Sequence, residues 1–382
     1  MKTLHKTLLV LFAALAVVSI YSSCKKDDNL PNGGEPRVRY VRITAPESSD
    51  SLLVGAGQGR LVAIIGENLQ GAQEIWFNDQ KATLTSTYIT STSILVRVPT
   101  PIPKDITNKL KIIFDNGYVL NHDFQVQISE PIVSAMLSEF VNEGDIAVIR
   151  GNYFYQPVKV TFAGGVEGQL EAVTDQEIRV RVPAGAQPGP ITVKTNFGET
   201  ESEFWFRDNR NIFISSDPYE GWWNQSYVVT NPGAGDPPKI NGNYIRVKKV
   251  LGAWSWNEIA GGPATAMPVH SKRVPDAAIL KPSDYNLKFE INTLKPYNNS
   301  WIRINVGLNA EQNDNYLWKP PFDTKGQWQT VIIPFEEIVA SYNPKPVVNP
   351  NGYWTRLLIQ GPGELDADIA FDNFRIVPKV NP

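Results

Sequence analysis

Short runs of alternating apolar and polar residues dominate the chain from about residue 40 onward. Val, Ile and Thr fill many of these runs, and Gly, Pro, Asn and Asp stand between them. Because successive side chains of a strand point to opposite faces, a period of two bounded by turn residues is typical of β-strands. We find no long stretch with the period of an amphipathic helix. The pattern therefore predicts an all-β protein.

Two segments of this pattern are copies of one another. "GRLVAIIGENLQ" at residues 59–70 aligns with "GDIAVIRGNYFY" at 144–155, and "VRVP" recurs at 96–99 and 180–183, so the spacing is about 85 residues. Each copy ends in a predicted hairpin. A repeat of this size predicts two consecutive immunoglobulin-like sandwiches of about seven strands. We interpret them as spacers, because their aromatic residues stand in strand patterns that suit core packing: Trp76, Phe77, Phe162, Phe204 and Phe206.

The remainder of the chain has a different pattern and predicts a jelly-roll β-sandwich. About eight strands in one domain of this length favour two packed sheets. The alternating runs that define the predicted strands lie at residues 211–216, 243–250, 284–292, 300–308, 327–335, 354–361 and 368–377.

The period of two also assigns faces to these strands. In "WIRINV", Ile302, Ile304 and Val306 are predicted to face the core. Applied to three strands, the same rule leaves a set of polar and aromatic residues on outward faces: Trp301, Arg303 and Asn305; Lys288, Glu290 and Asn292; Trp354, Arg356 and Gln360.

Tryptophan is concentrated in this last domain, since only Trp76 and Trp205 of the ten tryptophans precede it. A sugar ring has one face of C–H groups and a rim of hydroxyls, so it binds a flat apolar platform flanked by planar hydrogen-bonding groups. The stretch "LGAWSWNEIAGG" places two tryptophans on alternate residues beside glycines, as a loop would. Trp328 is predicted to be core. The predicted glycan-binding residues are Trp222, Trp223, Trp254, Trp256, Trp301, Arg303, Trp354 and Arg356.

The first residues predict export. Lys2 and Lys6 precede an apolar run from Leu8 to Ile20, which is too short for a permanent transmembrane helix and is typical of a signal peptide. Cys24 is the only cysteine, so no internal disulfide can form. "YSSC" resembles the lipobox of bacterial lipoproteins, although Tyr21 stands where Leu is usual. This resemblance implies cleavage before Cys24 and lipidation of its thiol, and "KKDD" resembles an outer-surface export signal.

The two repeats resemble IPT/TIG domains, and the whole arrangement resembles the surface glycan-binding lipoproteins of Sus-type polysaccharide uptake systems. The fold implied is two IPT/TIG sandwiches followed by a jelly roll like a carbohydrate-binding module. The resemblance implies a location on the exterior of the cell outer membrane, non-catalytic capture of a plant or fungal glycan such as a β-glucan, xyloglucan or mannan, and, as partners, a TonB-dependent transporter and a second glycan-binding lipoprotein.

These observations predict five segments. They are a signal peptide (1–23), a flexible tether (24–39), IPT/TIG-like domain 1 (40–128), IPT/TIG-like domain 2 (129–208) and a glycan-binding domain (209–382). The tether is assigned by its polar composition, which offers no core.

Other functions are less well supported by the sequence. The net charge of −3 offers no basic surface for nucleic acid. The Glu-x-Asp-x-x-Glu signature of jelly-roll hydrolases is absent, and no His or Cys spacing fits zinc or a catalytic triad. We therefore expect no enzyme, no cofactor and no catalytic metal. A structural calcium ion at Asp372 and an adhesin that binds a protein partner stay open as alternatives.

Overall fold

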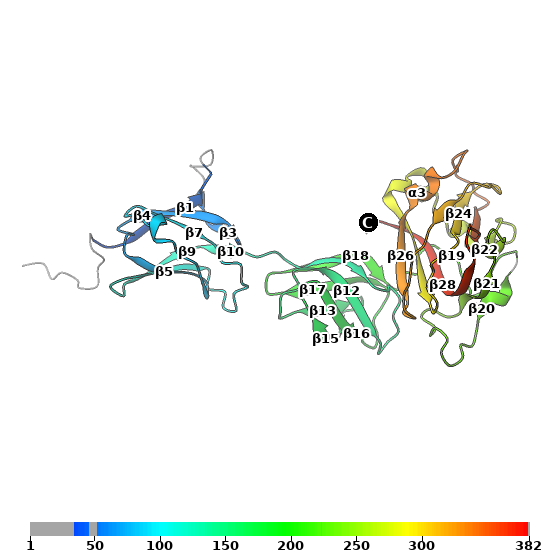
Figure 1. The fold of residues 1–382 in the computed structure, drawn as a ribbon, viewed down its shortest axis with the longest axis horizontal. Coiled ribbons are helices and arrows are strands. Elements are labelled where there is room, and N and C mark those ends of the chain that lie inside the picture. The colour runs from blue at the N-terminus through cyan, green and yellow to red at the C-terminus, as the bar shows by residue number, and fades with distance from the viewer. Residues whose placement is uncertain (1–33, 46–51, 223, 381–382) are drawn as a thin grey trace, which may run out of the picture. The chain divides into compact units, whose positions relative to one another are not determined.

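The computed structural model describes residues 34–45, 52–222 and 224–380. Nearly all regular structure in these residues is β-strand, which confirms the predicted fold class (Figure 1). Cys24, the whole predicted signal peptide and Trp223 lie outside the described residues. Within those described ranges, no helix combines the length and apolar character needed to cross a membrane. The chain divides into two compact units, residues 1–128 and 129–382.

The first unit is one β-sandwich. One sheet has the order β2 (Leu52–Leu53), β1 (Arg37–Ile43), β4 (Leu61–Glu67) and β7 (Ser93–Arg97). The other has the order β6 (Gln80–Lys81), β5 (Ala72–Phe77), β8 (Lys109–Phe114) and β9 (Val119–Asp123). The short strands β3 (Gly55–Gly57) and β10 (Gln125–Gln127) pair in parallel, and a 3-10 turn, η2, spans Ser86–Tyr88.

The second unit begins with a sandwich of the same kind. Its sheets have the orders β11 (Ile132–Met136), β12 (Ile146–Asn152), β16 (Glu177–Arg181), β15 (Gln169–Val173), and β14 (Val166–Glu167), β13 (Lys159–Phe162), β17 (Gly189–Thr195), β18 (Gly198–Phe206). Phe77, Phe162, Phe204 and Phe206 are buried as predicted. Trp76 is not: it is half-buried between Lys81 and Lys111, because its strand neighbour Phe77 faces the core.

One glycine explains the motif that the two sandwiches share. A Cβ on Gly66 would lie 2.0 Å from the carbonyl oxygen of Arg37, and a Cβ on Gly151 would lie 1.8 Å from that of Ile132. At both places the first strand of the domain carries a register shift opposite the glycine. The first strand therefore approaches too closely for any side chain, and the repeat keeps the residue that has none.

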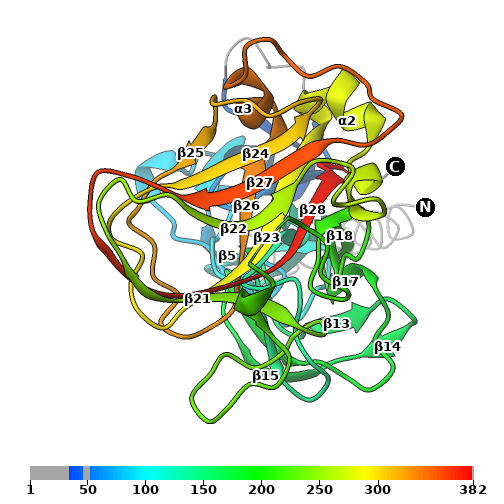
Figure 2. The ribbon, with the colours of Figure 1, turned by 90° about the vertical axis from the view of Figure 1, so that its right-hand side faces the viewer.

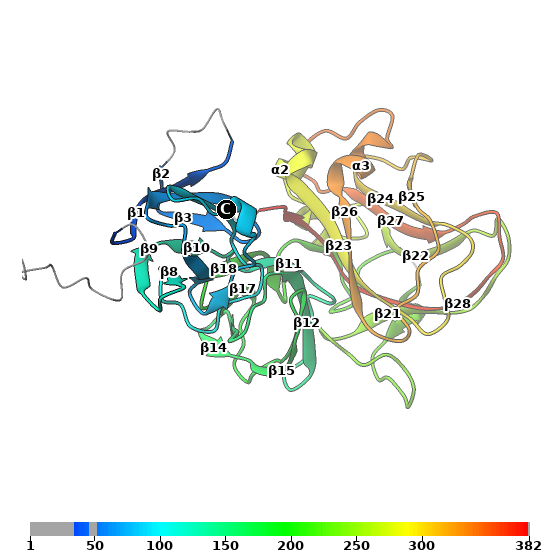
Figure 3. The same cartoon turned by 60° about the vertical axis from the view of Figure 1, so that its left-hand side comes forward.

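The C-terminal domain is a sandwich of two unequal sheets (Figures 2 and 3). The larger has the order β20 (Val228–Val229), β21 (Tyr244–Leu251), β28 (Leu365–Pro378), β23 (Tyr285–Thr293), β26 (Gln329–Pro334), and β19 (Ile212–Ile214) also pairs with β28. The smaller has the order β22 (Asn257–Gly262), β27 (Trp354–Ile359), β24 (Ile302–Leu308), β25 (Tyr316–Trp318). Short helical turns connect the strands: η3 (Gln225–Tyr227), η4 (His270–Arg273), α2 (Asp276–Leu280), η5 (Pro282–Asp284) and α3 (Phe335–Ala340).

The core between these sheets contains the apolar residues that the alternation assigned to it. Ile302, Ile304 and Val306 of β24 belong to it, together with their predicted counterparts Leu287, Phe289, Ile291, Leu357 and Ile359. Trp328 is buried as predicted, but on the opposite side of the larger sheet, beside Tyr244. Its indole Nε1 donates to the carbonyl oxygen of Pro238 at 2.8 Å.

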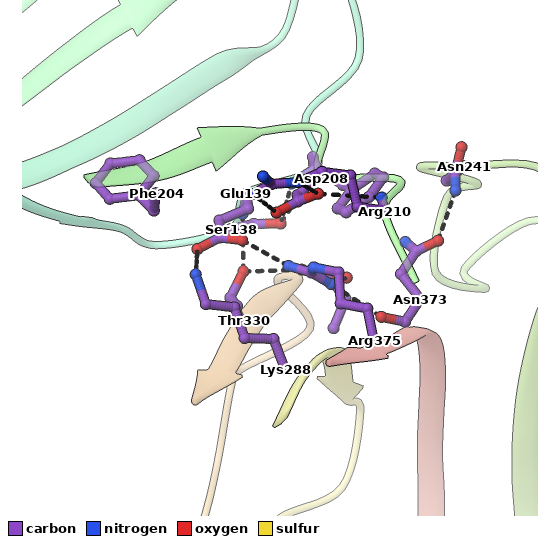
Figure 4. A network of polar contacts seen from close by, with 12 residues as sticks. Ser138, Glu139, Phe204, Asp208, Arg210, Asn241, Lys288, Thr330, Asn373 and Arg375 are labelled. Atoms are coloured by element: carbon purple, nitrogen blue, oxygen red, sulfur yellow. Dashed lines mark hydrogen bonds and ion pairs between the residues drawn. The ribbon is translucent and has the colours of Figure 1, made fainter. Parts of the chain in front are cut away.

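The outward residues of β23 are not exposed, which corrects the prediction for Lys288, Glu290 and Asn292. All three are at most 4% exposed. The preceding sandwich packs on Lys288 and its neighbour Arg375 (Figure 4), whereas Asn292 donates to the carbonyl oxygen of Gly326 in its own domain. Glu139, in the loop before β12, accepts a hydrogen bond from Lys288 Nζ and another from Arg375 Nη2, both at 2.6 Å. Arg375 also donates to Glu290 at 2.9 Å.

Backbone contacts complete this junction. The Thr330 N–H donates to the carbonyl oxygen of Leu137, and the Glu139 N–H donates to Thr330 Oγ1, both at 2.8 Å. The linker between β18 and β19 also contains an ion pair. The carboxylate of Asp208 is buried and lies 2.8 Å from the guanidinium of Arg210. Breaking a buried ion pair from one side costs roughly 3 to 5 kcal/mol. Domain 2 is therefore part of one body with the C-terminal domain.

Candidate glycan-binding face

The outer face of the smaller sheet carries most of the predicted site. We call the tryptophan face the set formed by Trp222, Trp254, Trp256, Trp301 and Trp354. Trp222 is 46% exposed, and Trp254 and Trp256 are each 54% exposed. Trp301 and Trp354 are partly buried. Large exposed aromatic side chains are unusual on a folded surface, and a group of them marks an interaction site.

These tryptophans gather at three places along β27. At its start, the rings of Trp222 and Trp354 meet edge to face with centroids 4.9 Å apart. At its middle, the guanidinium of Arg356 lies 5.3 Å from the ring of Trp256. Beyond its end, the Trp254 and Trp301 rings meet at 90° with centroids 5.5 Å apart. The seven residues from Trp354 to Gln360 span about 20 Å at the rise of a strand.

The loop between β21 and β22 presents Trp254 and Trp256 in a fixed turn. Trp254 has a φ of +58°, a left-handed conformation that is uncommon for a bulky residue. Its N–H donates to the carbonyl oxygen of Gly361 at 2.7 Å, and the Ser255 hydroxyl donates to that of Gly252 at 2.6 Å. These two hydrogen bonds hold the turn that presents the exposed indole of Trp254.

Arg356 packs against the ring of Trp256 and is itself held by several polar contacts. It is only 4% exposed, because it donates to Glu311 Oε1 at 2.9 Å and to the carbonyl oxygen of Gln312 at 2.8 Å. Glu258 lies 3.7 Å from it. Asn305 accepts a further, longer hydrogen bond from Arg356 at 3.3 Å and is itself buried. Of the outward polar residues predicted on this sheet, Asn305 and Arg356 are therefore covered, whereas Arg303 and Gln360 are partly exposed.

Trp222 is held by backbone contacts. Its N–H donates to the carbonyl oxygen of Gly261 at 3.2 Å. Two residues before it, Glu220 accepts the N–H groups of Val269 and His270 at 3.2 and 2.9 Å. Nearby, burial and then the charge of Glu258 raise the pKa of Tyr219 to about 12, so this tyrosine is neutral at physiological pH.

Sequence reasoning missed three charged residues that belong to this face. Glu258 and Glu311 balance Arg356, and Lys319 lies 5.5 Å from the ring of Trp301. Alternation was a usable signal for Lys319, since it follows β25 two residues after Leu317, the cross-strand partner of Arg303. No such signal existed for Glu311, which lies in a loop. Among the described residues, no group of three or more His, Cys, Asp or Glu side chains is arranged to hold a metal ion.

Comparison with known proteins indicates the kind of domain that carries this face. Residues 206–378 match the family model for the surface glycan-binding protein B xyloglucan binding domain. The C-terminal domain is therefore similar to the glycan-binding domain of surface glycan-binding proteins. The match confirms the predicted resemblance and the predicted function class, which is the binding of a polysaccharide at the cell surface.

Relatives extend the likeness over nearly the whole chain. An IPT/TIG domain-containing protein of Bacteroides ovatus is 28% identical, over 99% of this chain and 100% of its own. The crystal structure of surface glycan-binding protein B of Prevotella bryantii has a TM-score of 0.70 at 21% identity, covering 91% of this chain and 99% of that one, and so shares its fold. The corresponding protein from a complex xyloglucan utilization locus of Bacteroides uniformis is 19% identical, with a TM-score of 0.49 over 90% of this chain and 99% of its own.

Proposed function

We propose that the tryptophan face binds an extended β-1,4-linked glucan chain of the xyloglucan type. The observation that carries this proposal is the grouping of half-exposed tryptophans at three places along one strand, in the domain that matches a xyloglucan-binding family. Sugar rings stack on Trp222, Trp256 and Trp254 in turn. Arg303 and Gln360, which border the last of these, are placed to bond hydroxyl groups.

The expected affinity is modest. Each stacked sugar contributes on the order of 1 to 2 kcal/mol at about 25 cal/mol per Å² of apolar surface removed from water. After ordering costs, two or three stacks give a Kd of roughly micromolar to millimolar. Many copies on one cell then hold a long polymer through avidity.

We further propose that the protein neither cleaves its ligand nor needs a cofactor. A hydrolase needs two carboxylates directed at the scissile bond, whereas among the described residues both carboxylates that we assign to the face lie beside a cation. Glu258 and Glu311, the acidic residues of the face, both lie beside Arg356. Chelation with EDTA is expected to leave binding unchanged; a loss would point to a structural calcium ion.

We also propose that the protein is anchored on the exterior of the cell by a lipid. Lipid on Cys24 would hold the chain on the outer face of the outer membrane, where the captured glycan passes to a TonB-dependent transporter and a second glycan-binding lipoprotein. Replacing Cys24 with Ala is expected to release the protein from membranes without changing its affinity for glycan. Continued membrane attachment of the variant would contradict lipid anchoring at this residue.

The direct test is calorimetric titration of the chain with oligosaccharides of xyloglucan, mixed-linkage β-glucan and mannan, with reducing ends measured in parallel. The proposal expects binding to xyloglucan and no new reducing ends. Shortening of the polymer would instead identify an enzyme. Failure to bind any glycan would favour adhesion to a protein partner.

A further inference from the structure

The Trp301 end of the tryptophan face carries two positive charges, and no carboxylate of the part of the chain that the structure describes pairs with either. Arg303 Cζ lies 5.7 Å and Lys319 Nζ 5.5 Å from the centre of the Trp301 ring. Arg303 donates its Nε hydrogen to the carbonyl oxygen of Gln360 at 3.0 Å. Among the described residues, neither cation forms an ion pair. Arg356, by contrast, is paired with Glu311 and flanked by Glu258.

Strand register places these groups on one surface. Ile302 pairs with Trp318 and Arg303 with Leu317, so continuation of the same register sets Trp301 opposite Lys319. Trp301 and Arg303 are two residues apart and share a face. Three cations (Arg303, Lys319, Arg356) therefore stand on a face with two carboxylates (Glu258, Glu311), and the excess charge lies at the Trp301 end.

The surroundings of Arg303 add to this imbalance. Burial lowers the pKa of Arg303, and the charge of Arg356 lowers it further, with no acidic neighbour acting in the opposite direction. Glu258 lies two strands away in the register and is already beside Arg356. Within the described ranges, the hydrogen bond that the Arg303 side chain donates is the one from Nε. Its two terminal nitrogens can therefore bind a carboxylate through parallel hydrogen bonds.

We propose that this end of the face is a subsite for a carboxylate-bearing branch, such as a uronic acid, on the bound polysaccharide. The inference rests on the proposed function, because the backbone of the polymer must lie on the tryptophan face for its branch to reach Arg303 and Lys319. The alternative is that both cations hold the ring of Trp301 by cation–π contact and that Arg303 bonds only neutral hydroxyl groups of the glycan.

Matched polymers distinguish these roles. The probes are xyloglucan and the same xyloglucan after oxidation of its galactosyl C6 hydroxyls to carboxylates, titrated into the full chain. The oxidised polymer is expected to bind about three to ten times more tightly at low salt, as two partly exposed ion pairs would give. The preference should vanish near 1 M salt, where the screening length is about 3 Å.

Variants then assign the preference to residues. Lys319→Gln and Arg303→Gln are each expected to reduce the ratio of the two affinities by about two- to threefold. Lys281→Gln, an equal charge change at an exposed lysine beside Pro378 and Val380, should keep the parent ratio.

Two results would overturn the inference, and they are distinguishable. A ratio near one, with untreated xyloglucan still bound, leaves the proposed function intact and shows that the two cations bind no carboxylate. Failure of both polymers to bind removes the proposed function and the subsite together.

Discussion

The two sheets of the C-terminal domain carry similar residues on their outer faces and use them in opposite ways. On the larger sheet, Lys288 and Arg375 pair with Glu139 of domain 2 (Figure 4), and the buried Glu290 pairs with Arg375. On the smaller sheet, Trp254 and Trp256 stay half exposed above a framework of buried polar contacts. The outer face of the larger sheet is an interface between two domains, and the outer face of the smaller sheet is exposed and can bind a ligand.

Polar residues at outward positions of such a sandwich therefore do not identify a ligand-binding face. Arginine and glutamate at outward positions indicate only that the neighbouring surface is polar, whether that neighbour is water, a sugar or another domain. Exposed tryptophan is the discriminating feature, because a folded chain gains by covering it unless a ligand does so.

The largest expected effect is on the closed face. Replacing Arg375 with Met leaves Glu139 and Glu290 buried without their shared cation, which should cost about 3 to 5 kcal/mol of the unfolding free energy of the second unit. Urea denaturation of the full chain measures it. Arg39→Met is the matched control, since the Arg39–Glu67 pair is exposed and should cost at most about 1 kcal/mol. Equal losses would mean that the junction contributes little.

The next effect is on the open face. Trp256→Ala removes one stacking ring and should weaken xyloglucan binding roughly tenfold, equivalent to about 1.4 kcal/mol. Stability should change by less than about 0.5 kcal/mol, because the ring is half exposed. Tyr88→Ala, which removes an aromatic residue of similar exposure (51%) from the first unit, should bind as the parent does. Unchanged binding by Trp256→Ala would exclude this ring from the site.

The smallest effect concerns pH. Burial, and then the charge of Glu290, raise the pKa of Asp372 well above its ordinary value. Between the ordinary and the raised pKa the folded state holds a proton that the unfolded state lacks, so this residue lowers stability as pH rises through that window. Asp372→Asn should therefore raise the Tm by a few degrees at pH 7 to 8 and flatten its fall with pH. A lower Tm for the variant at pH 8 would show that the ionised carboxylate is stabilising there.

Much of the fold could be predicted from the sequence, because periodicity is a local signal. The core residues of β24 and the glycine shared by both repeats were readable from alternation and alignment alone. The burial of Lys288 was not, since it depends on Glu139, which lies 149 residues earlier in the chain. Periodicity says which face a residue occupies and nothing about what covers that face.

Local sequence patterns also predicted part of the candidate site. Trp254 and Trp256 were identified by composition and by their glycine neighbours, and the structure places both on the surface. That Arg356 lies beneath Trp256, and that Trp222 meets Trp354, depends on contacts between distant loops that no local pattern encodes.

The most direct test of the account is oxidative footprinting of the tryptophans by mass spectrometry, with and without xyloglucan. Trp222, Trp254 and Trp256 are expected to become protected when the glycan binds, while Trp328 stays unreactive in both states. Binding of xyloglucan that leaves these three rings as reactive as before would contradict it.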